Sequence, residues 1–136
     1  MQNIYDDDRF FAGYQQLRES KLGLNEAIEQ PAFRALLPPL EGLRVLDLGC
    51  GDGELARWCR ARGAAAVVGV DISEKMLGLA HQRTDDEAIT YVRSGLEVVQ
   101  FEPAAFDLVT SSFALHYVRD YPAVMRRIAG WLRPGG

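Results

Sequence analysis

Three glycines, Gly49, Gly51 and Gly53, follow the apolar run Val45–Leu48 and form a loop with glycine at every second position. Glycine lets a loop turn tightly and bring its backbone close to a ligand, because no Cβ stands in the way. Asp71 closes a second apolar run 22 positions after Gly49. Carboxylates that bind ribose hydroxyls lie at a similar spacing, roughly 20 residues after such a loop. Each feature alone also fits a tight turn or a helix cap, but together they predict a site for a ligand that carries a ribose.

The acidic residues of the loop help to choose between two classes of such ligands. Dinucleotide sites favour the spacing G-x-G-x-x-G, with a helix N-terminus directed at a pyrophosphate. This chain has G-x-G-x-G instead, flanked by Asp47 and Asp52. Carboxylates so close would repel a pyrophosphate but tolerate a ligand with a sulfonium and an ammonium group. The loop therefore favours S-adenosylmethionine, and Asp47 either contacts this ligand, directly or through water, or bonds the amides of its own loop.

Histidine and tyrosine side chains supply the other candidates for chemistry. His116 follows the fourth apolar run, where a parallel sheet presents the carboxyl ends of its strands to ligands, so it is a candidate general base. The alternative for His116 is packing beside Tyr117. Tyr5 and Tyr14 are lid candidates, because a tyrosine offers both a ring and a polar tip, although their spacing also fits core packing.

From Arg44 onward, short apolar runs alternate with segments of helical periodicity, which is typical of a parallel sheet covered by helices on both faces. The expected strands are Arg44–Leu48, Ala66–Val70, Ile89–Arg93 and Phe106–Ser111. The expected helices are Glu54–Arg62, Ser73–Thr84 with Ser73 as its N-cap, and Tyr121–Leu132. The sequence therefore predicts an α/β fold of three layers, with the glycine loop between the first strand and the helix that follows it.

Residues 1–39 precede this pattern and are expected to be helical. Phe10, Tyr14 and Leu17 recur at helical spacing, and Pro31 fits the first position of a helix that ends at Leu37. We expect residues 1–39 to form a lid or cap segment, and residues 1–136 to form a single domain.

Composition excludes several classes of protein. Hydrophobic residues make up 48% of the chain and charged residues 25%, a balance typical of soluble globular domains. The net charge of −4 argues against a sequence-independent grip on nucleic acid, so a small-molecule partner is expected. The polar start and the lack of a long apolar run predict a cytoplasmic protein without a membrane anchor. Cys50 and Cys59 alone make neither a disulfide framework nor a zinc site, and no metal is predicted.

Several segments resemble motifs of class I S-adenosylmethionine-dependent methyltransferases, which have a Rossmann-like fold. VLDLGCGDG, which begins at Val45, is similar to their motif I, and VGVDIS resembles the motif of their second strand. FDLVTSSFALHYVRD is similar to their fourth strand and the following loop, and LRPGG to the turn before their fifth strand. The resemblance covers the chain from Leu43 to its end, and it implies that S-adenosylmethionine binds and S-adenosylhomocysteine is the product.

The resemblance also implies roles for individual residues. The glycine loop would pass close to the methionine and ribose part of the cofactor, Asp71 would bind both ribose hydroxyls, and Ile72 would pack on the adenine ring. Many family members place an aspartate after the third strand, whereas this chain has Ser94 or Glu97 as a substitute for the adenine contact. The further cofactor-binding residues that we expect are Cys50, Met76, Ser94, Gly95, Leu96 and Ser111.

The reaction that the resemblance implies is transfer of a methyl group from the sulfonium to an O, N, S or C nucleophile of a small-molecule substrate. Because the sulfonium is already activated, the protein mainly has to hold the reactants together and exclude water, and a dedicated base such as His116 is optional. One rival is a non-catalytic module that binds S-adenosylmethionine or S-adenosylhomocysteine. A second rival is a nucleotide-dependent oxidoreductase, which the loop spacing disfavours.

The family's sheet would continue past Gly136 into three more strands, so the chain is expected to be the front part of a truncated domain. The expected strand order is 3-2-1-4, which leaves the fourth strand at an open edge. Phe106, Leu108 and Val109 suit an interior strand, and an unpaired apolar edge is an open site for association. We therefore expect self-association through this edge and little or no activity of the chain alone.

Overall fold

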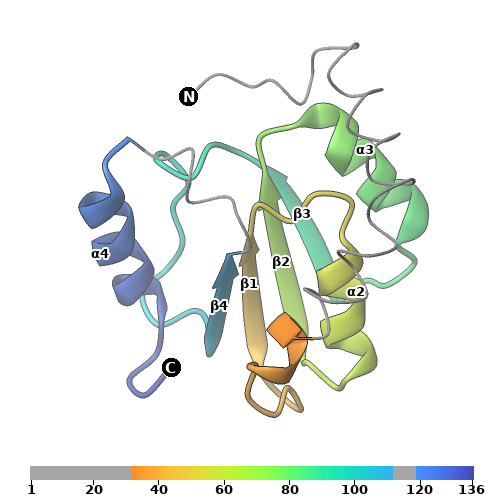
Figure 1. Cartoon of the computed structure of the whole chain (residues 1–136), viewed down its shortest axis with the longest axis horizontal. Coiled ribbons are helices and arrows are strands. Elements are labelled where there is room, and N and C mark those ends of the chain that lie inside the picture. Colours follow the sequence, from red (N-terminus) through yellow and green to blue (C-terminus); the bar gives the residue numbers. More distant parts are fainter. Residues whose placement is uncertain (1–31, 112–118) are drawn as a thin grey trace.

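The computed structural model describes residues 32–111 and 119–136. They form one parallel sheet of four strands, and the order across the sheet is β3-β2-β1-β4 (Figure 1). The strands are β1 (Arg44–Leu48), β2 (Ala66–Asp71), β3 (Ile89–Arg93) and β4 (Leu108–Ser111). The expected α/β fold and strand order are confirmed. The expected helix around Phe10–Leu17, the lid candidates Tyr5 and Tyr14, and His116 lie outside the described residues.

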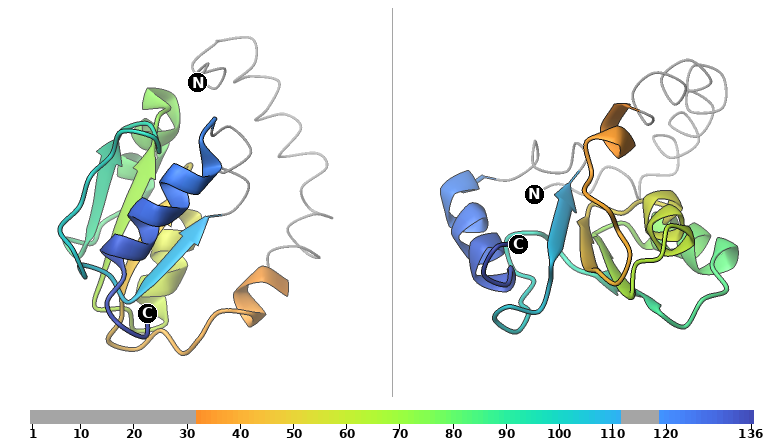
Figure 2. Two further views of the ribbon diagram at one scale, coloured as in Figure 1. Left: turned by 90° about the vertical axis from the view of Figure 1, so that its left-hand side faces the viewer. Right: turned by 90° about the horizontal axis from the view of Figure 1, so that it is seen from below.

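Helices cover both faces of the sheet, as Figure 2 shows. The helices are α2 (Glu54–Ala61), α3 (Glu74–Arg83) and α4 (Tyr121–Trp131). Val45 and Val67 pack with α2 residues such as Cys59 on one face, and Leu46 and Leu48 belong to the cluster around α4 on the other. Successive strand residues point to opposite faces, so a strand between two helix layers needs an almost continuous apolar run. This requirement explains why the apolar runs of the sequence predicted the strands. None of the helices in the described part of the chain is long and apolar enough to cross a membrane.

The ends of the elements follow local signals in the sequence. Ser73 caps α3 as predicted, because its hydroxyl accepts a hydrogen bond from the Met76 amide at 3.2 Å. Asp120 caps α4 through the Ala123 amide at 3.0 Å, and Pro122 lies in the first turn, where its missing N–H costs nothing. Within the described residues, the expected helix Pro31–Leu37 ends after residue 35, two residues earlier than predicted.

The fourth strand begins two residues later than expected, at Leu108 instead of Phe106. Phe106 makes a parallel bridge to Leu132: its amide donates to the Trp131 carbonyl at 3.0 Å, and its carbonyl accepts from the Arg133 amide at 2.9 Å. Among the described residues, this C-terminal turn is what pairs with the outer edge of the sheet next to β4. The order of the strands leaves β4 at this edge, and self-association through it stays a prediction.

A largely covered carboxylate ties the C-terminal turn to the start of β1. Asp107 accepts hydrogen bonds from the Arg44 amide at 2.8 Å and from the Arg44 guanidinium, and it forms an ion pair with Arg133. The side chain of Asp107 is 11% exposed. These hydrogen bonds favour the charged form and lower the pKa of Asp107 to about 2. Asp107 therefore links two segments that lie 63 residues apart along the chain.

We expect Asp107→Ala to lower the free energy of unfolding at pH 7 by about 1–3 kcal/mol, because the Arg44 amide loses a charged acceptor. The folded-state pKa lies below the ordinary value of 3.8, so this stabilisation is present above pH 4 and is lost as the pH falls toward 2. Urea unfolding of both proteins between pH 2 and pH 7 measures the difference. Glu102→Ala, at an exposed acid, is the control and should change little. A constant difference down to pH 2 would contradict the assignment.

Candidate cofactor site

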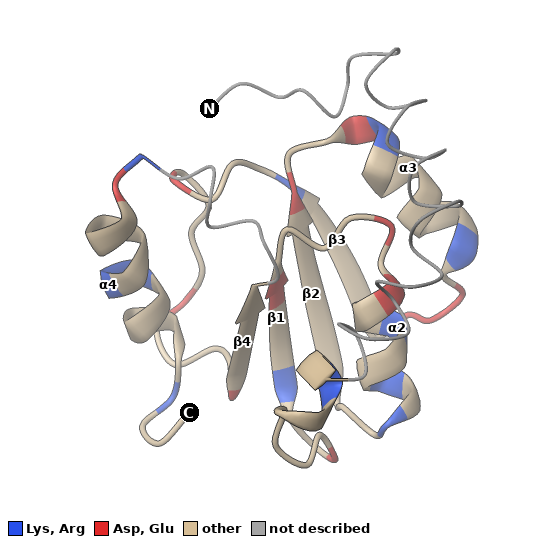
Figure 3. Ribbon diagram, viewed as in Figure 1, with Lys and Arg blue, Asp and Glu red and all other residues tan. Residues whose placement is uncertain are grey.

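The candidate site lies at the carboxyl ends of the strands. The chain leaves β1 toward α2 on one face, whereas the neighbouring strand β4 is followed by α4 on the opposite face, so the order of the sheet reverses between these two strands. Ligands of open α/β sheets bind beyond the carboxyl ends of the strands at such a reversal. Figure 3 shows acidic residues at the ends of β1 and β2 and in the loop before α2. This edge therefore presents carboxylates to a ligand.

All three glycines of the loop have a backbone conformation that favours glycine, and two of them are also closely packed. Gly49, Gly51 and Gly53 have φ angles of 78°, 56° and 82°, a left-handed region that favours glycine. A Cβ on Gly51 would lie 3.2 Å from the Cε atom of Met76, so Met76 closes over this part of the loop. A Cβ on Gly53 would instead collide with the Tyr91 hydroxyl. Gly51 is thus crowded from α3, and Gly53 from β3.

Asp71 holds the turn after β1 and the start of α3 together. One carboxylate oxygen accepts from the Gly51 amide and the other from the Ser73 amide, both at 2.9 Å. The sequence left open whether Asp71 binds a ligand or serves as a helix cap, and the structure shows that its carboxylate bonds both backbone segments. A carboxylate offers several acceptor positions, so one such side chain can bond backbone amides and a ligand hydroxyl together.

Asp47 is buried, with a side chain 3% exposed, and its carboxylate accepts a hydrogen bond from the Thr110 hydroxyl at 3.0 Å. The alternative that Asp47 bonds the amides of the loop is wrong: the Gly49 and Cys50 amides donate to the Val70 carbonyl, and Asp71 takes the next one. Burial raises the pKa of Asp47 to about 7, against the effect of the Thr110 bond and with a contribution from the charge of Asp71. The site thus holds a carboxyl whose charged form a nearby cation would stabilise.

The carboxylate of Asp52 has different partners from that of Asp47. Its carboxylate pairs with Arg83 at the end of α3 at 2.6 Å and accepts from the Glu54 amide at 3.3 Å. The repulsion of a pyrophosphate that we expected from both loop acids is therefore weaker for Asp52 than for Asp47. The features that distinguish this site from a dinucleotide site are therefore the spacing of the loop and the buried Asp47.

The residues expected around the adenine ring lie together at the ends of β2 and β3. A Cβ on Gly95 would lie 3.8 Å from Ile72 Cδ1, and the Ser94 amide donates to the Asp71 carbonyl at 3.1 Å. Leu96 is 5% exposed and belongs to the core cluster around α4. Glu97 accepts from the Arg119 amide at 3.1 Å, so of the two possible substitutes for the family's aspartate, Ser94 lies nearer to Asp71.

Two further predicted residues show different surroundings. The Cys50 side chain packs against Gly69, where an added Cβ would lie 2.9 Å from the Cys50 Sγ atom. Burial and the nearby acids raise the pKa of the Cys50 thiol. Any contact of Cys50 with a ligand therefore has to come from its backbone. Ser111 ends β4 beside Leu48, and its Oγ atom is buried without a hydrogen-bond partner among the described residues.

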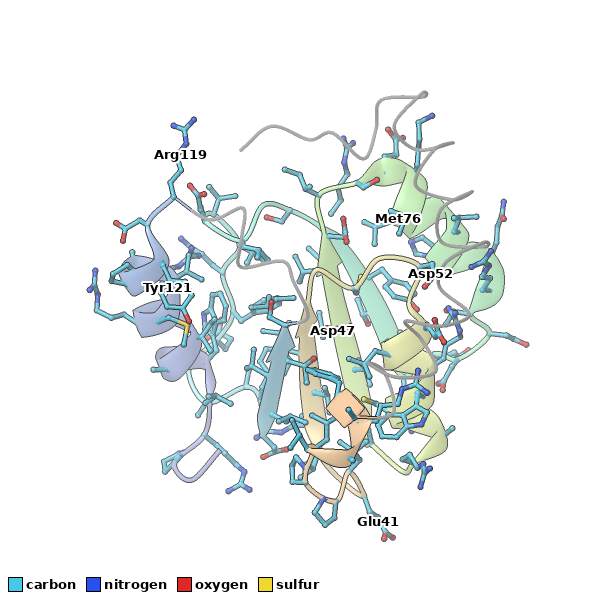
Figure 4. The ribbon with its side chains drawn as sticks, in the orientation of Figure 1. Glu41, Asp47, Asp52, Met76, Arg119 and Tyr121 are labelled. Atoms are coloured by element: carbon cyan, nitrogen blue, oxygen red, sulfur yellow. The ribbon has the colours of Figure 1, made fainter. Side chains whose placement is uncertain are left out.

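Figure 4 shows Asp47, Asp52 and Met76 toward the end of the sheet to which the strands point, and Glu41 at the opposite end. A surface cavity of about 740 Å³ lies near Glu41 and is lined by Arg34, Pro38, Trp58 and Arg62, among others. Its lining residue Arg34 pairs with Glu54 at the start of α2 at 3.5 Å, but neither the glycine loop nor the two buried acids line it. We therefore place the site by its hydrogen bonds and its position on the sheet, and not by this cavity.

The residues that support the site from behind were not predicted from the sequence. Thr110 bonds Asp47, Arg83 pairs with Asp52, and Tyr91 packs on Gly53. Thr110 carried a usable signal, because a polar residue near the end of an apolar strand in a parallel sheet needs a partner on its neighbour. The roles of Arg83 and Tyr91 depend on how α3 and β3 pack against the loop, which no local pattern reveals.

The residues present fit S-adenosylmethionine on the evidence of the site itself. The glycine loop has left-handed turns that a Cβ would obstruct, Asp71 places a carboxylate against this loop, and Asp47 is a buried carboxyl suited to an ammonium group. Asp71 matches the ribose of that molecule, and Asp47 matches its amino-acid portion. The glycine loop allows the backbone to come close to both parts.

Comparisons with known proteins point the same way. A sequence profile described as a methyltransferase domain matches residues 45–136. An uncharacterized protein of Haemophilus influenzae is 41% identical over 98% of this chain and 55% of its own length. A ubiquinone biosynthesis O-methyltransferase of Rhizobium etli is 40% identical over 72% of this chain and 40% of its own length.

The crystal structure of an S-adenosylmethionine dependent methyltransferase from Mesorhizobium loti matches with 47% identity and a TM-score of 0.77. That match covers 79% of this chain and 50% of the other. This chain thus spans about half the length of the relatives that it matches. With the sheet order, the glycine loop and the paired Asp71 described above, these similarities show that the chain belongs to the class I S-adenosylmethionine-dependent methyltransferases.

Proposed function

We propose that this chain binds S-adenosylmethionine over the glycine loop and contributes this cofactor site to a methyltransferase that acts on a small molecule. The observation that carries the proposal is the position of Asp71, whose carboxylate ends β2 and holds the Gly51 amide of the glycine loop, where a carboxylate that binds ribose hydroxyls is expected. The cofactor supplies an activated methyl group when it is bound. The protein has to supply binding, orientation and exclusion of water.

In this proposal, the residues of the site divide these tasks. Asp71 binds the ribose, and Ile72 with Gly95 lines the adenine side. Asp47 attracts the ammonium group, because a cation close to this buried carboxyl would stabilise its charged form. Met76 closes over Gly51 and keeps water from that side of the loop. Ser111, whose hydroxyl is buried at the end of β4, lies on the side where the nucleophile would approach.

The charge of the chain and one of its relatives support a small organic acceptor. The net charge of −4 disfavours nucleic acid as the acceptor. The Rhizobium etli relative is named as an O-methyltransferase of ubiquinone biosynthesis, which supports a small organic acceptor for this chain as well. The acceptor atom stays open between O, N, S and C.

Isothermal calorimetry with S-adenosylhomocysteine, NAD and NADP tests the proposal directly. We expect the chain to bind S-adenosylhomocysteine and neither dinucleotide. Binding without methyl transfer to any acceptor would favour the non-catalytic module over an enzyme. Binding of NAD alone would overturn the proposal in favour of an oxidoreductase.

The buried Asp47 predicts that cofactor binding releases a proton near neutral pH. Its pKa of about 7 means that a large part of the population is protonated in the free chain at pH 6.5, and an ammonium group nearby lowers this pKa. Calorimetry at pH 6.5 in buffers with different ionisation enthalpies should show a release of roughly half a proton or more per bound S-adenosylhomocysteine. Asp47→Asn should abolish the release and weaken binding, whereas Asp85→Asn, at an exposed acid, should leave both unchanged.

The same substitution should stabilise the free chain. Because the folded-state pKa of Asp47 is raised from 3.8 to about 7, its contribution to stability falls as the pH rises between these values. The full effect of such a change is about 4 kcal/mol, so Asp47→Asn should unfold at higher urea concentration than the unmodified chain at pH 8. Equal stability of the two proteins at pH 8 would show that Asp47 is not a buried, reluctantly ionised group.

A further inference from the structure

Behind the glycine loop, a chain of polar contacts connects α2, the end of α3 and β3. The Nη1 atom of Arg57 donates to the Asp52 carbonyl at 2.7 Å and to the Thr84 hydroxyl at 3.2 Å. The Thr84 and Tyr91 hydroxyls lie 2.7 Å apart in a further hydrogen bond. The three side chains therefore join the loop backbone to two other elements of the fold.

Two glycines make room for the ring of Tyr91. A Cβ on Gly69 in β2 would lie 3.0 Å from Cδ1 of the ring, and a Cβ on Gly53 would collide with its hydroxyl. The ring thus fills the space between the middle of β2 and the glycine loop. Any side chain larger than hydrogen at either glycine would displace it.

We propose that Arg57, Thr84 and Tyr91 form a clamp that positions the glycine loop for the cofactor. This inference rests on the proposed function. The clamp fixes the Asp52 carbonyl and the backbone of Gly53, and these residues directly follow the Gly51 amide that Asp71 holds. A loop that is already ordered loses less conformational entropy when a ligand binds, so the clamp raises affinity without touching the ligand.

The salt bridge between Arg83 and Asp52 supports the loop from the same direction but is a weaker test of the inference. Arg83 is half exposed, with 50% of its side chain accessible, and exposed ion pairs contribute little. Thr84 is the better target, because its hydroxyl is bonded to both Arg57 and Tyr91. Removing that one atom breaks two contacts of the clamp.

Thr84→Val removes the hydroxyl and keeps the shape of the side chain. We expect it to raise the Kd for S-adenosylhomocysteine by roughly 2- to 12-fold, the range that corresponds to one lost hydrogen bond. Thr84→Ser restores the hydroxyl and should return the Kd to within about 2-fold of the original value. Thr90→Val makes the same chemical change at an exposed threonine of β3 and should leave the Kd unchanged.

A second measurement needs no cofactor. Hydrogen exchange of the Gly53 amide, which donates to the Cys50 carbonyl at 3.0 Å, should be faster in the free Thr84→Val chain than in the unmodified one. If the unmodified chain does not bind S-adenosylhomocysteine, the proposed function fails, and this exchange rate still tests the clamp. A Thr84→Val chain that melts at a lower temperature but keeps both its Kd and its Gly53 exchange rate would overturn the clamp.

Discussion

Asp71→Ala should weaken binding of S-adenosylhomocysteine by about 10- to 150-fold, the effect of losing charge-assisted hydrogen bonds of roughly 1.5–3 kcal/mol in total. The structure adds a second reason for a large effect, because the Asp71 carboxylate also holds the amides of Gly51 and Ser73. Without it, the loop loses its anchor to the start of α3, and the Gly51 amide loses its acceptor.

Asp71→Asn separates these two contributions. An asparagine keeps one acceptor oxygen, so it can hold the Gly51 amide or the Ser73 amide but not both. We expect its affinity to lie between those of the unmodified chain and of Asp71→Ala. Its melting temperature should fall less than that of Asp71→Ala.

Calorimetric titration of the three proteins with S-adenosylhomocysteine measures these differences. Asp85→Ala, at an exposed acid two residues beyond α3, is the matched control and should bind normally. An unchanged dissociation constant of Asp71→Ala for S-adenosylhomocysteine would show that Asp71 does not bind the cofactor.

Gly53→Ala should destabilise the chain by about 2–5 kcal/mol. The left-handed φ of 82° costs an alanine about 1–2 kcal/mol. The collision of its Cβ with the Tyr91 hydroxyl adds overpacking of typically about 1–3 kcal/mol. Because the tyrosine must move, the variant should also bind S-adenosylhomocysteine more weakly.

Two other glycines separate the backbone cost from the collision. Gly42 has a similar φ of 75°, and a Cβ added there would meet nothing within 4 Å, so Gly42→Ala should show only the cost of the left-handed conformation. Gly78, inside α3, also has open space, and Gly78→Ala should stabilise the helix by about 0.5–1 kcal/mol. Tyr91→Phe removes the colliding oxygen and should partly rescue Gly53→Ala. Urea unfolding with equal losses for Gly42→Ala and Gly53→Ala would show that Tyr91 does not crowd Gly53.

The strands were predictable because burial on both faces leaves a direct mark on the sequence. Arg44–Leu48 and Ile89–Arg93 were predicted with the observed bounds, since each is a run of mostly β-branched or apolar residues. The start of β4 was not, because Phe106 is as apolar as the strand that it precedes. Its partner is Leu132, and a pairing over that separation has no local signal.

The candidate site was predictable where spacing along one segment sets the chemistry. The glycine loop and Asp71 belong to one strand, loop, helix and strand unit, so their proximity follows from the alternating pattern. The orientation of Asp52 was not predictable, since it depends on Arg83, 31 residues away at the end of another helix. The same limit applies to Asp47, whose burial depends on the docking of β4.

The bond between Thr110 and Asp47 spans 63 residues, and this separation has a consequence for synthesis. At about 5–20 residues per second, a ribosome adds Thr110 roughly 3–13 s after Asp47. During that time Asp47 is a hydrated carboxylate with the acidity of an unfolded chain. When β4 docks and buries it, the carboxyl takes up about half a proton on average at neutral pH, because its pKa rises to about 7. β4 therefore joins the nascent domain in a step that is coupled to proton uptake, and alkaline conditions oppose that step.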